Sequence, residues 1–180
     1  RQSAIECENG VLLLIGYDAD GCWLSRSFDN GYTWQEFIPI ARNTDRIEFS
    51  EPSLICLEGG HIFCVMRTLD KRTNRSTWIY QAHGWNWGYQ WQAPIATSMR
   101  GLPPSLIVLD DGRILCSYGY RRTPFGVHAC LSHDEGLTWD TEHEIILRSD
   151  GADFDMGYPS SIQIDSEHIL TVYYIHTKDN

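Results

Sequence analysis

The chain has 180 residues, the length of a single domain, and a formal net charge of −10 at pH 7. This excess of negative charge argues against nucleic acid, whose phosphates would be repelled. No apolar run approaches the roughly 18 residues of a membrane-spanning helix, and no signal-peptide pattern is visible, so we expect no membrane partner. The chain contains 15 glycines, 7 tryptophans and 9 tyrosines, and it has almost no helical periodicity, which favours an all-β chain.

In chain order, the predicted strands group into blades of a β-propeller. Residues 10–40 hold the last three strands of one blade, 51–99 and 103–148 form two whole blades, and 158–176 form the first half of another. Closed propellers have about four to eight blades. We therefore interpret residues 1–180 as a single partial β-propeller domain with about three four-stranded blades.

The blades are marked by a short pattern, Ser-x-Asp-x-Gly-x-Thr-Trp, at 27–34 and 132–139, with a degraded copy at 84–91. The tryptophans that end these copies are 57 and 48 residues apart, a spacing typical of propeller blades. The Asp can accept hydrogen bonds from its own turn, and the Gly supplies the positive φ of a tight turn. We expect Thr and Trp to begin the next strand and Trp to fill the space between blades. The motif therefore has a predicted structural role, between the third and fourth strands of a blade.

A second repeat fixes the register of the innermost strands. Each of three segments begins with a Pro-Ser pair and continues as strand, hairpin and strand, and the pairs are 52 and 55 residues apart. The residues before the pairs are Glu51, Pro103 and Tyr158. We expect these three residues to occupy the same position in successive blades, immediately before the innermost strand.

Three arginines are expected on the same face of the ring. Arg67 ends the second strand of its blade, and Arg121 and Arg122 follow the equivalent strand of the next blade. A buried Arg needs a partner. Because the innermost strands surround the central axis, these side chains and those before the Pro-Ser pairs should open onto one pocket.

The cysteines give no sign of a metal site. None of the six forms a Cys-x-x-Cys pair, so we expect no zinc, and no cofactor is indicated. Cys56, Cys64 and Cys116 lie in apolar strand runs, where a free cysteine acts as a small core residue. Unpaired cysteines slightly favour a cytoplasmic location, although disulfides between neighbouring strands stay open.

Both complete motifs resemble the Asp-boxes of the sialidase (neuraminidase) superfamily, BNR-repeat proteins that form six-bladed propellers. The resemblance covers nearly the whole chain and implies about half of a six-bladed ring. Residues 51–67 resemble the family segment that carries an activating Glu and a carboxylate-binding Arg. Residues 157–161 resemble the region that carries a nucleophilic Tyr.

The resemblance implies a retaining exo-glycoside hydrolase that acts on sialic acid or a related acidic sugar. Tyr158 would attack the anomeric carbon while Glu51 draws off its proton. A neutral Tyr suits this position, because the substrate carboxylate would repel a carboxylate nucleophile. Arg67 and one of Arg121 and Arg122 would bind the substrate carboxylate bidentately.

The chain also departs from the family pattern. The first blades of the family, which carry an acid/base Asp and one Arg of the triad, have no counterpart, so we expect the isolated chain to be nearly inactive. Asp155 adds negative charge near the predicted anion pocket and could instead bind a hydroxyl group of a neutral sugar. The alternative function is a non-catalytic carbohydrate-binding module.

A self-assembling half-propeller is a further alternative. In it, two copies related by a twofold axis would fill each other's gaps and pair their exposed strand edges as a homodimer. The chain begins at Arg1 rather than Met and ends at Asn180 within a blade. On these grounds we expect a fragment of a longer protein rather than a half-propeller.

Overall fold

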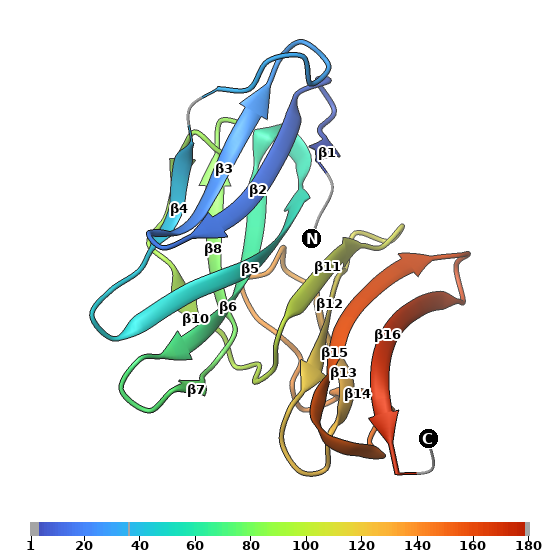
Figure 1. Ribbon diagram of the computed structural model, residues 1–180. Helices are drawn as coiled ribbons and strands as arrows, with labels where there is room; N and C mark the ends of the chain where they lie inside the picture. The colour runs from blue at the N-terminus through green and yellow to red at the C-terminus, as the bar shows by residue number, and fades with distance from the viewer. Residues whose placement is uncertain (1–3, 36, 179–180) are drawn as a thin grey trace.

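A computed structural model of the chain describes residues 4–35 and 37–178; Arg1 and Asn180 lie outside the described residues. The chain forms successive antiparallel sheets (Figure 1). The first sheet has the order β1 (Ile5–Glu6), β2 (Leu12–Asp18), β3 (Gly21–Ser27) and β4 (Ile38–Arg42). This first sheet differs from the expectation for 10–40, because the two-residue strand β1 supplies a fourth, innermost strand that pairs with β2.

The second sheet is the largest, and its main path begins with β5 (Ile47–Cys56) and β6 (Ile62–Asp70), followed by β8 (Tyr80–Trp85) and β10 (Ile95–Ala96). The short strands β7 (Arg75–Ser76) and β9 (Gln90–Trp91) pair with β6 and β8. A single 3₁₀ turn, Glu58–Gly60, connects β5 and β6. No helix in the described part of the chain has the length and apolar character needed to cross a membrane.

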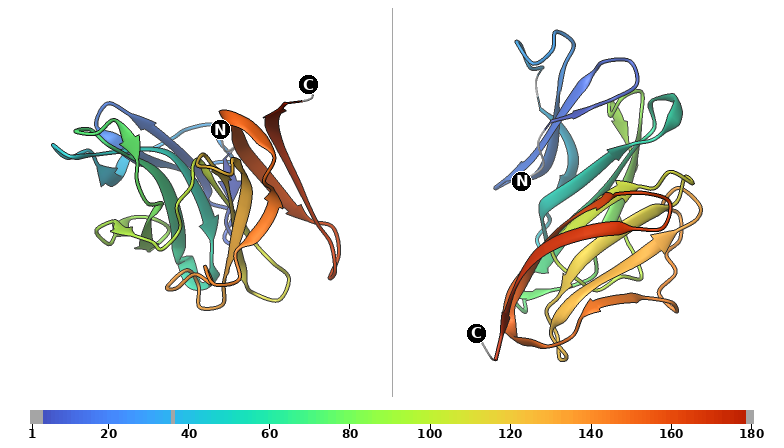
Figure 2. Two further views of the ribbon diagram at one scale, coloured as in Figure 1. Left: turned by 90° about the horizontal axis from the view of Figure 1, so that it is seen from below. Right: turned by 90° about the vertical axis from the view of Figure 1, so that its right-hand side faces the viewer.

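The third sheet has the order β11 (Pro104–Val108), β12 (Ile114–Tyr120), β13 (Gly126–Ser132) and β14 (Ile145–Arg148). The last is a hairpin of β15 (Gly151–Gln163) and β16 (Ile169–Thr177), which lies beside the third sheet (Figure 2). These sheets confirm the all-β propeller with four-stranded blades.

Two apolar clusters hold neighbouring sheets together. One joins the first and second sheets through residues such as Leu13, Leu24 and Leu54. The other joins the second and third sheets through Phe63 and Ile114, among others. Polar contacts also cross between innermost strands, since the backbone N–H of Leu106 donates to Ser53 Oγ over 3.0 Å.

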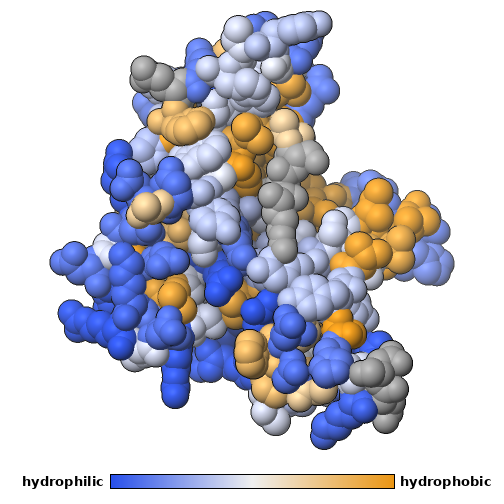
Figure 3. Space-filling view, in the orientation of Figure 1, coloured by the Kyte–Doolittle hydropathy of each residue, from blue (hydrophilic) through white to orange (hydrophobic). Residues whose placement is uncertain are grey.

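The β15–β16 hairpin leaves apolar side chains exposed (Figure 3). Ile162, Ile164 and Val172 are about 60% exposed, and Leu170 is about half exposed. Apolar patches of this kind mark surfaces that contact another segment or molecule.

The predicted turn role of the Asp-boxes is confirmed. Asp29 Oδ1 accepts from the backbone N–H of Thr33 at 2.8 Å, and its Oδ2 accepts from the Thr33 hydroxyl at 2.6 Å. The Ser27 hydroxyl donates to Asp29 and accepts from the backbone N–H of Gly31. The second box repeats this set around Asp134.

The glycine of the second box is required for space as well as for conformation. Gly136 has a φ of +87°, and a Cβ added there would lie 2.4 Å from the ring of Phe63 in β6. Because a real Cβ does not approach so closely, the turn can pack on the preceding blade only with glycine at this position.

Trp139 fills the space between blades as predicted. It is 8% exposed and packs in the cluster that joins the second and third sheets. Its Nε1 donates to Gln81 Oε1 over 2.8 Å, and Gln81 Nε2 donates to the carbonyl of Gly136 over 2.7 Å. The expectation that Thr and Trp begin the next strand was wrong, because β4 starts at Ile38 and β14 at Ile145. The box continues as an irregular segment before the fourth strand begins.

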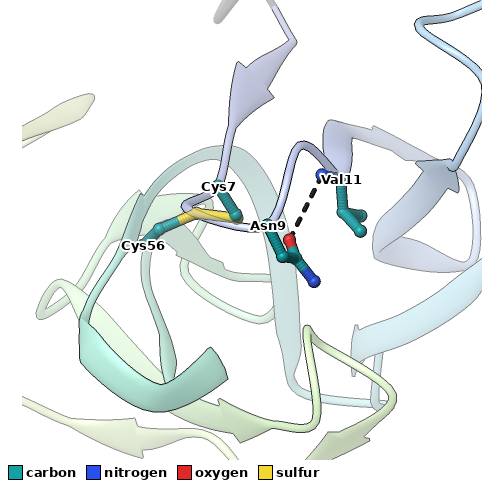
Figure 4. The surroundings of a disulfide bond; sticks show 4 residues. All are labelled: Cys7, Asn9, Val11 and Cys56. Carbon is teal, nitrogen blue, oxygen red and sulfur yellow. Dashed lines mark hydrogen bonds between the residues drawn. A yellow bond between two sulfur atoms is a disulfide. The ribbon is translucent and has the colours of Figure 1, made fainter.

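A disulfide joins Cys7 to Cys56, the last residue of β5 (Figure 4). The expectation that Cys56 is a free core residue was therefore wrong. Cys56 no longer supports the expectation of a cytoplasmic location, which was drawn from unpaired cysteines. Cys64 and Cys116 are free and buried as expected. The bond adds a covalent link to the apolar cluster that joins the first and second sheets.

We expect the substitution Asp134→Ala to lower the free energy of unfolding by about 1–3 kcal/mol, because it leaves donors of the turn without their acceptor. Burial raises the pKa of Asp134, but the hydrogen bonds from Thr138 and Ser132 outweigh it and hold the pKa below the ordinary 3.8. The contribution of Asp134 is therefore present at neutral pH and is lost as pH falls through the lowered pKa. Urea unfolding at pH 7 and in acid measures both effects.

The control is Asp45→Ala, at an exposed carboxylate with no hydrogen bond among the described residues. It should change the unfolding free energy by less than about 0.5 kcal/mol. Equal effects of the two substitutions would contradict the assigned role of the box.

Candidate functional site

The phenol of Tyr158 and the carboxylate of Glu51 meet although they are 107 positions apart in sequence. The Tyr158 hydroxyl donates to Glu51 Oε1 over 2.7 Å. Glu51 comes from β5 and Tyr158 from β15, with the start of β11 between them. The three Pro-Ser pairs and the residues before them line one cavity of about 250 Å³. The structure thus brings the repeat positions at Glu51, Pro103 and Tyr158 to one place.

Both residues lie inside their strands rather than before them, which corrects the sequence-based placement. Glu51 has a φ of +45° and Tyr158 a φ of +54°. Each lies at a register irregularity, between Ser50 and Ser53 in one case and between Gly157 and Ser160 in the other. Such bulges change the direction of a side chain. Non-glycine residues rarely adopt positive φ, and those that do cluster at functional sites.

Arg67 completes a three-residue network. Its Nη1 donates to Glu51 Oε2 over 3.1 Å, so the two carboxylate oxygens of Glu51 contact different partners. The side chain of Glu51 is 11% exposed and that of Arg67 is 26% exposed. A carboxylate so little exposed to water needs hydrogen-bonding partners of this kind. Glu51 is therefore held in place by hydrogen bonds to both of its carboxylate oxygens.

Of the two adjacent arginines, Arg121 lies nearer to Tyr158. Its guanidinium carbon is 5.6 Å from the centre of the Tyr158 ring, and its Nε donates to the carbonyl of Met156 over 2.9 Å. Arg122 is exposed. Both arginines line a second cavity of about 440 Å³ together with Arg67.

Asp155 reaches this site only indirectly. Its Oδ1 accepts from the Tyr174 hydroxyl over 2.7 Å, and the Tyr174 ring stacks on the Tyr158 ring at 5.8 Å. Asp155 lines neither cavity. Burial, and then the hydrogen bond to Asp155, raise the pKa of Tyr174. Asp155 thus orients the aromatic neighbour of Tyr158, and its contact with substrate stays a prediction.

Sequence reasoning missed Tyr174, Arg75 and Arg100. Tyr174 pairs with Gly157 across the β15–β16 hairpin, so the register of the hairpin could have placed it beside Tyr158. Arg75 and Arg100 line the second cavity from the short strand β7 and from the segment before β11. No repeated motif marks either arginine. Among the described residues, no group of three or more His, Cys, Asp or Glu side chains is arranged to hold a metal ion.

Comparison with known proteins agrees with this architecture. A family model described as a BNR repeat-like domain matches residues 1–170. A crystal structure of a protein of unknown function from Dyadobacter fermentans is 29% identical and superposes with a TM-score of 0.86; the match covers 97% of this chain and 48% of that one. No curated protein sequence matches the chain.

Two further structures share the fold at lower identity. The Hadza microbial sialidase Hz136 is 15% identical with a TM-score of 0.73, and the match covers 96% of this chain and 45% of that one. The xylan beta-1,4-xylosidase from Bacillus halodurans C-125 is 15% identical with a TM-score of 0.64, covering 91% of this chain and 34% of that one.

The fold and its boxes define a sialidase-type β-propeller, and the chain belongs to the BNR repeat-like domain family. It spans about half the length of the Dyadobacter fermentans protein and of the Hadza sialidase.

We expect Glu51→Gly to be more stable than Glu51→Ala by about 1 kcal/mol, because glycine adopts positive φ without the penalty of a Cβ. Both variants lose the same carboxylate, so their difference reports the backbone alone. Urea unfolding of the two variants measures it.

The matched control is Ser53, two residues further along β5, whose φ is not positive. There the order should reverse, with Ser53→Gly less stable than Ser53→Ala by about 0.5–1 kcal/mol. If alanine is the more stable substitution at both positions, Glu51 is not strained.

Proposed function

We propose that the complete protein is a retaining exo-glycoside hydrolase for sialic acid or a related acidic sugar. The observation that carries this proposal is the 2.7 Å hydrogen bond from the Tyr158 hydroxyl to Glu51. A phenol paired with a fixed carboxylate is a nucleophile paired with its base. The sialidase among the structural neighbours supports the same assignment, although it shares only the fold at 15% identity.

In the proposed reaction Tyr158 Oη attacks the anomeric carbon while its proton passes to Glu51 Oε1. The glycosidic bond to the leaving group breaks, and the sugar is then bound covalently to the Tyr158 oxygen. Water attacks the same carbon in a second step and gives up a proton to the group that had protonated the leaving oxygen, while the Tyr158 oxygen takes back its proton from Glu51 as it leaves. Two displacements at one carbon retain the anomeric configuration.

The arginines account for an acidic substrate in this proposal. Arg121 beside the Tyr158 ring and Arg67 beside Glu51 present guanidinium groups around the place of attack. A guanidinium binds a carboxylate through two parallel hydrogen bonds. A second role for Arg67 is to hold Glu51 in place through the hydrogen bond to its Oε2. The group that protonates the leaving oxygen is assigned to no described residue.

A second candidate is a ring completed by a second copy of the chain. It is supported by the exposed apolar face of the β15–β16 hairpin, where Ile162 and Val172 are 59% and 58% exposed. Light scattering on a size-exclusion column tests it. A mass of twice 20.7 kDa for this chain supports the homodimer, and a monomer excludes it.

The function is tested with Tyr158→Phe and Glu51→Gln in the complete protein, on a fluorogenic aryl sialoside. Loss of a general base costs about 10²–10⁴ in rate, so we expect Glu51→Gln to lower kcat/KM by that factor. Tyr158→Phe, which keeps the stacked ring but has no nucleophilic oxygen, should lower it at least as much.

Tyr32→Phe is the matched control, since Tyr32 is 88% exposed and outside the site. It should keep the parent rate. If Tyr158→Phe also keeps that rate, the Tyr158 oxygen is not the nucleophile. NMR of the released sugar measures its anomeric configuration. Inversion of that configuration would exclude the covalent intermediate.

A further inference from the structure

The second cavity gathers positive charge in a chain that is strongly acidic. Five arginines line it in a chain with a net charge of −10: Arg67, Arg75, Arg100, Arg121 and Arg122. Among the described residues, Arg67 is the member of this set that forms an ion pair, with Glu51. The remaining guanidinium groups repel one another, which favours binding of an anion there.

Two of these arginines lie outside the network around Tyr158. Arg100 is held in position by Trp78, since its guanidinium carbon is 3.8 Å from the centre of the Trp78 ring. Arg75 lies in β7, a two-residue strand of the second sheet that pairs with β6. Neither has a role in the proposed attack on the anomeric carbon.

The arginine-lined cavity directly adjoins the pocket of Tyr158. Arg67 lines the larger cavity and contacts Glu51, which lines the smaller one. Arg121 lines the larger cavity and lies beside the Tyr158 ring. A glycan whose terminal sugar occupied the smaller cavity would thus extend into the larger one.

We propose that Arg75 and Arg100 form a second anion subsite, which binds an acidic group on the sugar next to the one attacked. The substrate is then a polyanionic glycan, with carboxylate or sulfate groups on neighbouring residues, rather than a neutral chain with one acidic end. This proposal rests on the proposed function only in taking the Tyr158 pocket as the site of the terminal sugar. Guanidinium groups suit both anions, since a carboxylate and a sulfate each present two oxygens that can accept parallel hydrogen bonds.

The test measures binding to the complete protein by isothermal titration calorimetry. The probes are a chondroitin 4-sulfate tetrasaccharide, its unsulfated form, and the unsulfated form with its carboxylates reduced to alcohols. The variant Arg75→Gln/Arg100→Gln should bind the charged probes more weakly by about tenfold per arginine, the factor of one charge-assisted hydrogen bond. The reduced probe should bind the parent weakly and be unaffected by the substitutions.

The control variant Arg42→Gln/Arg113→Gln removes the same charge at the exposed Arg42 and the partly exposed Arg113, both outside this cavity. It should bind all probes as the parent does. Equal losses in the two double variants, or equal affinity of the parent for charged and reduced probes, would overturn the proposal. A loss confined to the sulfated probe identifies the anion as sulfate, and equal losses for sulfated and unsulfated probes identify it as carboxylate.

A kinetic measurement separates this proposal from the proposed function. Hydrolysis of an aryl sialoside, which carries a single acidic group, should persist in Arg75→Gln/Arg100→Gln. If the parent discriminates among the three probes but hydrolyses no sialoside, the catalytic proposal fails and the subsite stands. If it hydrolyses sialosides without any preference for charged probes, only the subsite fails.

Discussion

The angle between neighbouring blades is set where the Asp-box of one blade packs on the strands of the blade before it. Gln81 in β8 contacts the second box twice, through the indole N–H of Trp139 and the carbonyl of Gly136. The ring of Phe63 fills the space beneath the glycine. Buried amide hydrogen bonds are directional, so they define the separation of the sheets more closely than apolar packing alone. The site depends on this separation, because Glu51 and Tyr158 come from different blades and meet over one hydrogen bond.

The parts of the fold that are local in sequence could be predicted. An Asp-box makes its hydrogen bonds within eight residues, so its residues determine its geometry, and Asp29 and Asp134 have the predicted partners. The repeat register also predicted that Glu51 and Tyr158 share one position. The sequence offers no sign of β1, because two residues cannot show a period-2 pattern. Nor could it show that Cys7 lies beside Cys56, which depends on how two sheets pack.

Arg75 and Arg100 were missed for one physical cause, whereas Tyr174 lies in a regular strand where the hairpin register could have placed it. The positions of Arg75 and Arg100 depend on irregular segments whose course is set by long-range contacts, such as that of Arg100 with Trp78. The bulges at Glu51 and Tyr158 were hidden for another reason, because the sequence places both residues just before a strand rather than inside one. Backbone strain at these two positions is stabilised by the network that the same side chains form.

The disulfide between Cys7 and Cys56 has a mechanical consequence. It closes a covalent loop with a sequence separation of 49 residues, which includes all of β5 and therefore Glu51. A force applied to the two ends of the chain does not stretch the residues inside this loop. The disulfide-bonded chain therefore extends by about 160–175 Å less than the same chain without the bond. The backbone at Glu51 therefore carries no chain tension while the bond is intact, whereas Arg67 and Tyr158 lie outside the loop. Only a reductant exposes that half of the site to stretching.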